Sequence, residues 1–225
     1  MDALLLDFNG VIVDDEPLHF ASFRDVLADN GLVLSESQYY TEYLGFDDRA
    51  AFAHAFRRAG RPLEPAHLAA LIARKARAYA ERAAHDLKVV PGVADFVHQA
   101  ARQARVGVVS GALRAEIDFG LEAAGLLGVV ETVVSPDDVP TTKPDPAGYR
   151  LAMRRLAAKH GDGAWRAVVF EDSLPGLTAA RALGAGCVML ATTHREKHLA
   201  SADAVWDSFA NHSPDELAPL WRTLP

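Results

Sequence analysis

The chain contains a single cysteine, Cys187, among its 225 residues. One thiol excludes an intrachain disulfide, so the sequence does not favour an oxidising compartment. Cys187 lies in the apolar run 187–190, and free cysteines are among the most buried residue types. We therefore expect a buried, structural thiol.

Long apolar runs are also absent. No run in the sequence approaches the roughly 18 residues of a membrane-spanning helix. The first residues carry neither a basic leader nor a cleavage site, so we expect no signal peptide. The sequence therefore predicts no membrane partner and, by default, a cytoplasmic location.

Positive charge is in the minority. There are 23 lysines and arginines against 30 aspartates and glutamates, which gives a formal net charge of −7. Nucleic-acid binding requires a clustered positive face, so we expect no nucleic-acid partner. A small anionic ligand remains compatible, because a few local cations suffice to bind it. We expect a monomer or a weak homo-oligomer.

Half of the residues are hydrophobic, enough for a sizeable core. Short apolar runs alternate along the chain with helical patterns. This alternation predicts an α/β fold with a Rossmann-like parallel sheet and helices on both faces. The expected strands cover 3–8, 106–109, 129–134, 167–170 and 186–190, and the expected helices 93–102, 114–124, 147–159 and 174–183.

The segment 14–88 has no convincing strand pattern. It predicts helices over 16–30, 36–44, 48–59 and 65–84, separated by glycine-containing breaks. We therefore predict an inserted helical cap domain, residues 14–88, within an α/β core domain formed by residues 1–13 and 89–225. Hinges are expected near 13–16 and 88–92, and closure of the cap would exclude water from a substrate.

Asp7 follows the first predicted strand. Active sites of open α/β sheets lie beyond the carboxyl ends of the strands. A buried acid there is costly without a partner or a metal, and a carboxylate can attack phosphorus. Taken alone, Asp7 is equally compatible with a turn or a helix cap.

The next two motifs suit an anion. Ser110, Gly111 and Ala112 offer a hydroxyl and backbone amides at the start of a helix, which can cradle an anion. Lys143, in a proline-flanked segment before another helix, could neutralise a phosphoryl group. The ordinary alternatives are a helix N-cap for Ser110 and a surface turn for Lys143.

Glu171 and Asp172 follow the strand predicted at 167–170. Adjacent acids at this position form a hard oxygen site suited to Mg²⁺. The competing interpretation is a pair of acids that complement the dipole of the following helix.

In chain order, the motifs supply a nucleophile, a hydroxyl, a lysine and an acid pair. This ordered set resembles the haloacid dehalogenase superfamily over nearly the whole chain, with a helical insert similar to the cap of its first class. The most similar subgroup contains β-phosphoglucomutase and the small sugar-phosphate phosphatases. The resemblance implies Mg²⁺ between the Asp7 carboxylate, the Asn9 backbone carbonyl and Asp172, with Glu171 near the metal's waters. The implied catalytic residues are Asp7, Asn9, Ser110 and Lys143.

The resemblance also implies a substrate-binding role for residues of the cap. In the mutase-like subgroup, residues at these positions hold a phosphate or close the cap. His19, Arg49 and Lys75 are equally compatible with surface positions. The implied substrate-binding residues are His19, Gly45, Arg49, Lys75, Gly111 and Ala112.

Asn9 departs from the pattern of this subgroup, whose phosphatases and mutases carry a second aspartate there. Asparagine has no titratable proton and cannot act as a general acid or base. General acid–base catalysis contributes roughly 10²–10⁴-fold in rate. Four explanations remain open: another group supplies the proton, the leaving group needs little help, the protein is attenuated, or Asn9 is an engineered or deamidating residue. Nearby proton sources are His19, Asp14, Asp15 and Glu16.

The sequence thus predicts a Mg²⁺-dependent phosphatase that acts on a small phosphorylated metabolite, foremost a sugar phosphate, through an aspartyl-phosphate on Asp7. A phosphomutase of the β-phosphoglucomutase type and a non-catalytic phosphate-binding protein are the alternatives. Dehalogenation is disfavoured because Glu171 and Asp172 supply a metal site. Phosphonate hydrolysis is disfavoured because Arg49 replaces the cap lysine that it uses.

Overall fold

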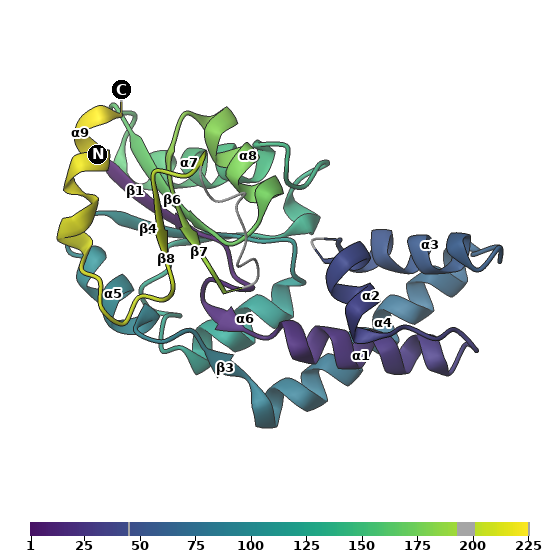
Figure 1. Cartoon of the computed structure of the whole chain (residues 1–225). Helices are drawn as coiled ribbons and strands as arrows, with labels where there is room; N and C mark the ends of the chain where they lie inside the picture. Colours follow the sequence, from purple (N-terminus) through teal and green to yellow (C-terminus); the bar gives the residue numbers. More distant parts are fainter. Residues whose placement is uncertain (45, 193–200, 225) are drawn as a thin grey trace. The chain divides into compact units, whose positions relative to one another are not determined.

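The computed structural model describes residues 1–44, 46–192 and 201–224. The chain divides into two compact units, one formed by Met1–Asp14 with Lys88–Pro225 and the other by Asp15–Leu87 (Figure 1). The first is an α/β unit and the second is helical.

A parallel sheet forms the centre of the α/β unit. Its strand order is β5-β4-β1-β6-β7-β8, and all neighbours run parallel. The predicted α/β fold with a Rossmann-like sheet is therefore confirmed. The strands are β1 (Asp2–Leu6), β4 (Arg105–Val109), β5 (Thr132–Val134), β6 (Arg166–Glu171), β7 (Gly186–Leu190) and β8 (Ala204–Trp206).

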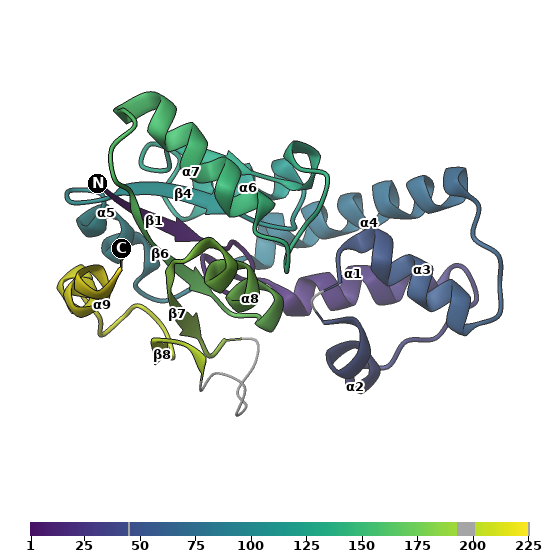
Figure 2. The same cartoon turned by 90° about the horizontal axis from the view of Figure 1, so that it is seen from above.

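Helices cover both faces of this sheet. Figures 1 and 2 show α7 and α8 on one side and α5 on the other. Alternate β1 residues serve the two faces, because side chains of a strand point to opposite sides. Ala3 and Leu5 pack in the cluster under α7 and α8, where Cys187 is fully buried. The helices are α5 (Val93–Ala100), α6 (Arg114–Ala123), α7 (Ala147–His160), α8 (Leu174–Leu183) and α9 (Ala218–Thr223).

The opposite face is aromatic. The ring of Phe96 in α5 lies 5.4 Å from that of Phe170 in β6, centroid to centroid. Trp206 and Phe209 complete this cluster from the C-terminal segment. The sheet is thus buried on both sides, as its continuous apolar strands require.

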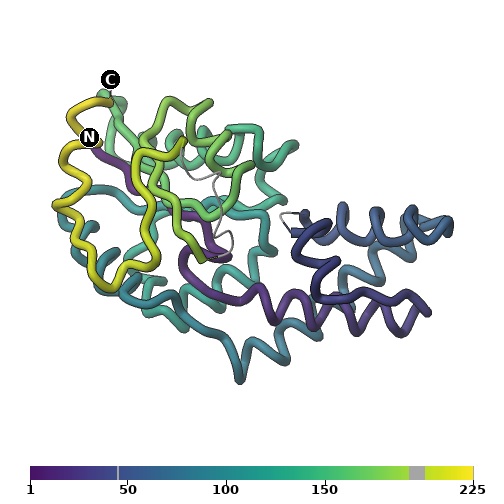
Figure 3. Tube along the Cα trace, in the orientation of Figure 1, coloured from purple at the N-terminus to yellow at the C-terminus, as the bar shows by residue number. Residues whose placement is uncertain are grey.

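The two ends of the chain lie near each other, as the trace in Figure 3 shows. Arg166, at the start of β6, donates hydrogen bonds to Asp2 and to the backbone carbonyl of Trp221. These contacts hold α9 at the amino ends of β1 and β6. The carboxyl ends of the strands therefore remain free of the termini.

Some sequence-based boundaries were wrong. The strand expected over 129–134 begins only at Thr132, because Val129 and Val130 form a turn through hydrogen bonds to Leu126. The short strands β2 (Val13–Asp14) and β3 (Lys88–Val89) pair antiparallel, and β8 adds an edge strand. Strands of two or three residues are too short for a recognisable apolar period.

The helical unit contains α1 (Glu16–Ala28), α2 (Glu36–Gln38), a π-helix (Tyr39–Tyr43), α3 (Asp48–Arg58) and α4 (Pro65–Asp86). The continuous helix expected over 36–44 was wrong, because its second half is the π-helix. Tyr39 and Tyr43 are both buried there, and their rings stack 6.4 Å apart. They join an aromatic core that includes Phe23, Phe52 and Phe56.

Among the described helices, none is both long enough and apolar enough to cross a membrane.

Candidate active site

The site lies where the strand order of the sheet reverses. β4 and β5 lie on one side of β1, and β6, β7 and β8 lie on the other. Ligands of such sheets bind outside the carboxyl ends of the strands at this point. Asp7 directly follows β1, Ser110 directly follows β4, and Glu171 ends β6. The loops that carry the predicted motifs therefore converge.

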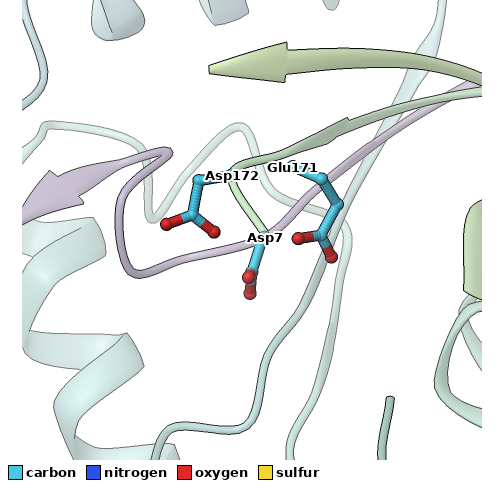
Figure 4. A group of neighbouring side chains, drawn as sticks. All are labelled: Asp7, Glu171 and Asp172. Atoms are coloured by element: carbon cyan, nitrogen blue, oxygen red, sulfur yellow. The ribbon is translucent and has the colours of Figure 1, made fainter. Parts of the chain in front are cut away.

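Three buried carboxylates meet at this edge, as Figure 4 shows. Asp7, Glu171 and Asp172 each offer one oxygen, and these oxygens all lie within 4.8 Å of one another. Buried like charges at this spacing disfavour full ionisation unless a cation offsets them. A compact set of carboxylate oxygens is the donor type that Mg²⁺ prefers, so these residues fit the expected metal.

Lys143 supplies one cation to this group. Its Nζ lies 2.9 Å from Asp7 Oδ1 and 2.5 Å from Glu171 Oε1. The peptide bond that follows it, to Pro144, is cis. Burial lowers the pKa of Lys143, but the charges of Asp7 and Glu171 outweigh that effect and raise the pKa above its ordinary value. Lys143 is therefore a fixed positive charge between two acids.

The Asp7 carboxyl is subject to opposing effects on its pKa. Burial, with the charge of Glu171, raises its pKa to about 7, although Lys143 opposes the rise. The Phe8 amide donates a hydrogen bond of 2.8 Å to Asp7 Oδ1. A further cation at the acid cluster would favour the ionised carboxylate, which is the form that can act as a nucleophile.

Ser110 and Asn9 are neighbours. The Ser110 hydroxyl donates to Asn9 Oδ1 over 3.4 Å and accepts the Ala112 amide over 3.0 Å. The Ala112 N–H, which we expected to face an anion, thus donates to Ser110 in this structure. Gly111 is exposed beside it. Ser110 is buried against the site rather than displayed as a surface cap.

Two further residues complete the surroundings of Glu171. Tyr149 donates a hydrogen bond of 2.5 Å to Oε1, and Ser173 donates one of 3.1 Å to Oε2. Sequence reasoning missed both. Tyr149 lies within an ordinary helical pattern, where only the register of the helix shows that it faces the strand ends. Burial, followed by the charge of Glu171, raises the pKa of Tyr149 well above its ordinary value, so it remains a donor.

The residues expected in the cap lie in the helical unit. Lys75 is 2% exposed, and its Nζ lies 2.6 Å from His19 Nδ1 and 2.9 Å from Asp48 Oδ1. His19 Nε2 in turn lies 3.2 Å from Asp15. Lys75 is therefore a buried, paired cation, and the alternative of a surface position was wrong for it. Arg49 is exposed, and Gly45 lies outside the described residues.

Comparison with known proteins identifies the family. Residues 4–190 match the model of the haloacid dehalogenase-like hydrolases. The chain is 30% identical over 223 residues to protein CbbY of Cereibacter sphaeroides, covering 93% of each chain. It is 37% identical over 118 residues to validoxylamine A 7'-phosphate phosphatase of Streptomyces hygroscopicus subsp. limoneus, covering 52% of this chain and 53% of that protein.

A solved structure agrees in fold. The crystal structure of a mutant of CbbY from Rhodobacter sphaeroides, in complex with xylulose-(1,5)bisphosphate, superposes with a TM-score of 0.80 at 28% identity. The match covers 93% of this chain and 95% of the other. The family predicted from the strand-end motifs is thereby confirmed, and the chain belongs to the haloacid dehalogenase-like hydrolases.

Proposed function

We propose that this chain is a Mg²⁺-dependent phosphatase that hydrolyses a small phosphorylated metabolite, foremost a sugar phosphate, through an aspartyl-phosphate on Asp7. The observation that carries the proposal is the contact of Lys143 with Asp7 at the edge of the buried acid cluster. A nucleophilic carboxylate, a fixed cation and a set of metal-binding oxygens are what phosphoryl transfer needs, since its catalysis is mainly positioning and charge stabilisation.

The relatives support this enzyme class. One is named as the phosphatase of a phosphorylated small molecule, and the CbbY structure contains a sugar bisphosphate. They agree with the predicted phosphoric monoester hydrolase. A phosphomutase and a non-catalytic binding protein are not favoured by these comparisons.

We assign separate catalytic and metal-binding roles to residues of the α/β unit. Asp7 attacks the phosphoryl group, and Lys143 offsets the negative charge shared between them. The Ser110 hydroxyl can turn from Asn9 to a phosphoryl oxygen, since a hydroxyl rotates to suit its partner. Asp7, Asp172 and the Asn9 backbone carbonyl would hold Mg²⁺, with Glu171 beside them. The metal, when bound, would neutralise charge on the transferring group.

The Asn9 side chain cannot perform the protonation steps. Its side-chain amide can accept and donate hydrogen bonds, yet it carries no titratable proton. His19, Asp14, Asp15 and Glu16 remain the proposed alternatives. His19, Gly45, Arg49 and Lys75 remain the proposed substrate-binding residues of the helical unit.

A substrate screen tests the proposal. Phosphorylated metabolites are incubated with Mg²⁺ and the wild-type chain or Asp7→Asn, and free phosphate is measured. We expect release by the wild type, none by Asp7→Asn, and none after chelation of the metal. The matched control is Asp118→Asn, which removes an exposed carboxylate paired with Arg114. Full activity in Asp7→Asn would overturn the mechanism.

A further inference from the structure

Glu171 is the most buried acid of the site, and it depends on a small number of donors. Its side chain is fully buried. Oε1 accepts from the Tyr149 hydroxyl and contacts Lys143, each at 2.5 Å, while Oε2 accepts from Ser173. A buried carboxylate is costly unless such partners satisfy it. Its position is therefore set by these three side chains.

Tyr149 contacts both members of the Glu171–Lys143 pair. Its hydroxyl bonds the carboxylate, and its ring centroid lies 5.3 Å from Lys143 Nζ. An aromatic face attracts a cation at this distance. The Tyr149 side chain thus contacts both the Glu171 carboxylate and the Lys143 ammonium group.

Close packing fixes Tyr149 itself. The preceding residue, Gly148, lies so near β4 that an added Cβ would approach Val109 Cγ1 to 2.7 Å. At the start of α8, a Cβ on Gly176 would lie 1.8–2.0 Å from the Glu171 carboxylate. The missing side chains let both helices press against the strand ends, where Tyr149 and Ser173 donate to Glu171. Tyr149 is fully buried and has no room to turn away.

We infer that Tyr149 is a positioning residue, which holds Glu171 so that Lys143 stays against Asp7. Lys143 Nζ lies between two carboxylates, 2.5 Å from Glu171 and 2.9 Å from Asp7. When the hydrogen bond from Tyr149 is lost, Glu171 has only Lys143 and Ser173 to stabilise its charge. Lys143 is then drawn toward Glu171 and away from Asp7. The inference rests on the proposed function, because it assigns Tyr149 a part in charge stabilisation at Asp7.

A double-mutant cycle tests this inference. Tyr149→Phe keeps the ring and removes the hydroxyl, and Glu171→Gln removes the charge that the hydroxyl stabilises. We expect Tyr149→Phe to lower kcat about tenfold, the factor that corresponds to a hydrogen bond to a charged group, with little change in KM. In the Glu171→Gln background, the same change should alter kcat less than about threefold, because contacting residues are not additive.

The matched control is Leu156→Val, a buried core substitution on the same helix, seven residues beyond Tyr149 and in the same apolar cluster. It should lower stability without changing kcat. An equal loss of kcat in Leu156→Val and Tyr149→Phe would show a merely structural role. An unchanged tenfold effect of Tyr149→Phe in the Glu171→Gln background would also overturn the inference.

A second readout separates this inference from the proposed function. The affinity for orthovanadate with Mg²⁺, measured by calorimetry, follows the placement of Lys143 without turnover. A wild type that binds orthovanadate but hydrolyses no ester would overturn the phosphatase proposal. The double-mutant cycle on Tyr149 and Glu171 could then still be completed with orthovanadate affinities in place of kcat. The free energies of unfolding of the wild type, the two single variants and the double variant give the coupling of Tyr149 to Glu171 without any ligand. Additive effects of the two substitutions on these free energies would overturn the inference.

Discussion

Ser110 donates a hydrogen bond of 3.4 Å to the side-chain oxygen of Asn9. The contact joins the loops that follow β4 and β1, and it places an amide where the resembling phosphatases and mutases carry a carboxyl. The amide preserves an acceptor for Ser110 and a backbone carbonyl for a metal. It removes the proton that a general acid would deliver to the leaving oxygen. In the proposed mechanism the amide also cannot activate the water that would release the phosphoryl group from Asp7, so we expect capture by Asp7 to be less impaired than release.

Asn9→Asp should restore the missing acid. We expect turnover of small, unactivated phosphate esters to rise at least about tenfold, since general acid–base help contributes roughly 10²–10⁴-fold. The measurement is phosphate release by both proteins, run in parallel across the same panel of metabolites. Intact mass of the starting protein tests for prior deamidation, which would add about one dalton to the mass of an amide-bearing chain.

An unchanged rate would contradict this prediction. It would mean that another group already supplies the proton. An activated substrate, such as an aryl phosphate, is the internal control, because a good leaving group needs little acid help. The gain in Asn9→Asp should therefore be smaller for the aryl ester than for the sugar phosphate.

The convergence of the site residues could be predicted from the sequence because polar side chains follow the predicted strands. Asp7, Glu171 and Asp172 come after apolar runs, and the carboxyl ends of parallel strands meet at one edge. Lys143 was singled out differently, by its place in a proline-flanked segment before a helix, and the structure brings it against Asp7 and Glu171. The convergence of these residues is a property of the topology, so a linear reading could reach it.

Other features depend on three-dimensional packing and were missed. Tyr149 reaches Glu171 only because α7 presses against β4 at Gly148. The pairing of the buried Lys75 with Asp48 joins residues far apart in the sequence. Neither contact leaves a periodic or compositional signal in the chain. The π-helix over Tyr39–Tyr43 was missed for a similar reason, since aromatic packing rather than helix propensity accompanies it.

Binding of Mg²⁺ should weaken as the pH falls below about 7, the pKa of Asp7 in the metal-free protein. The raised pKa means that the carboxyl is protonated below this pH, so the metal must displace a proton. Affinity should therefore fall by up to about tenfold per pH unit on the acid side and level off above pH 7. Calorimetry at several pH values measures it.

The raised pKa of Asp7 has the opposite effect on the stability of the metal-free protein, which should fall as the pH rises. Between the ordinary carboxyl value and about pH 7, the folded chain holds a proton on Asp7 that the unfolded chain has released. This contribution to stability is complete at low pH and is lost as the pH rises through that window. Asp7→Asn should abolish both dependences. A metal affinity that is flat between pH 5 and pH 8 would contradict the assignment of Asp7 as a ligand.

Asp172 and Glu171 should differ as metal ligands. In the proposed site Asp172 holds the metal directly and Glu171 lies beside it, with its oxygens engaged by protein groups, so we expect Asp172→Asn to weaken Mg²⁺ binding more than Glu171→Gln does. The loss in Asp172→Asn should be at least about tenfold, which is the loss that even an outer partner of a metal ligand causes. Calorimetric titration measures both variants, with Asp118→Asn as the matched surface control. A larger loss in Glu171→Gln would show that Glu171 turns to bind the metal directly.

Gly176 packs directly against the acid cluster, so a side chain at this position should lower the stability of the fold. A Cβ at this position would overlap the Glu171 carboxylate, at 1.8 Å from its carbon and 2.0 Å from its oxygens. Neither partner can move easily, because Glu171 is fully buried and Gly176 lies in the first turn of α8. We expect Gly176→Ala to lower the free energy of unfolding by about 1–3 kcal/mol, the usual cost of overpacking a core.

Urea unfolding measures this loss as a lower midpoint at an unchanged slope. The matched control is Gly128→Ala, because an added Cβ there meets no atom within 4 Å. It should change the free energy of unfolding by less than about 0.5 kcal/mol. If Gly176→Ala were as stable as Gly128→Ala, α8 would have to shift away from Glu171. The carboxylate would then lose its close packing, and Mg²⁺ affinity would fall although the fold remained stable.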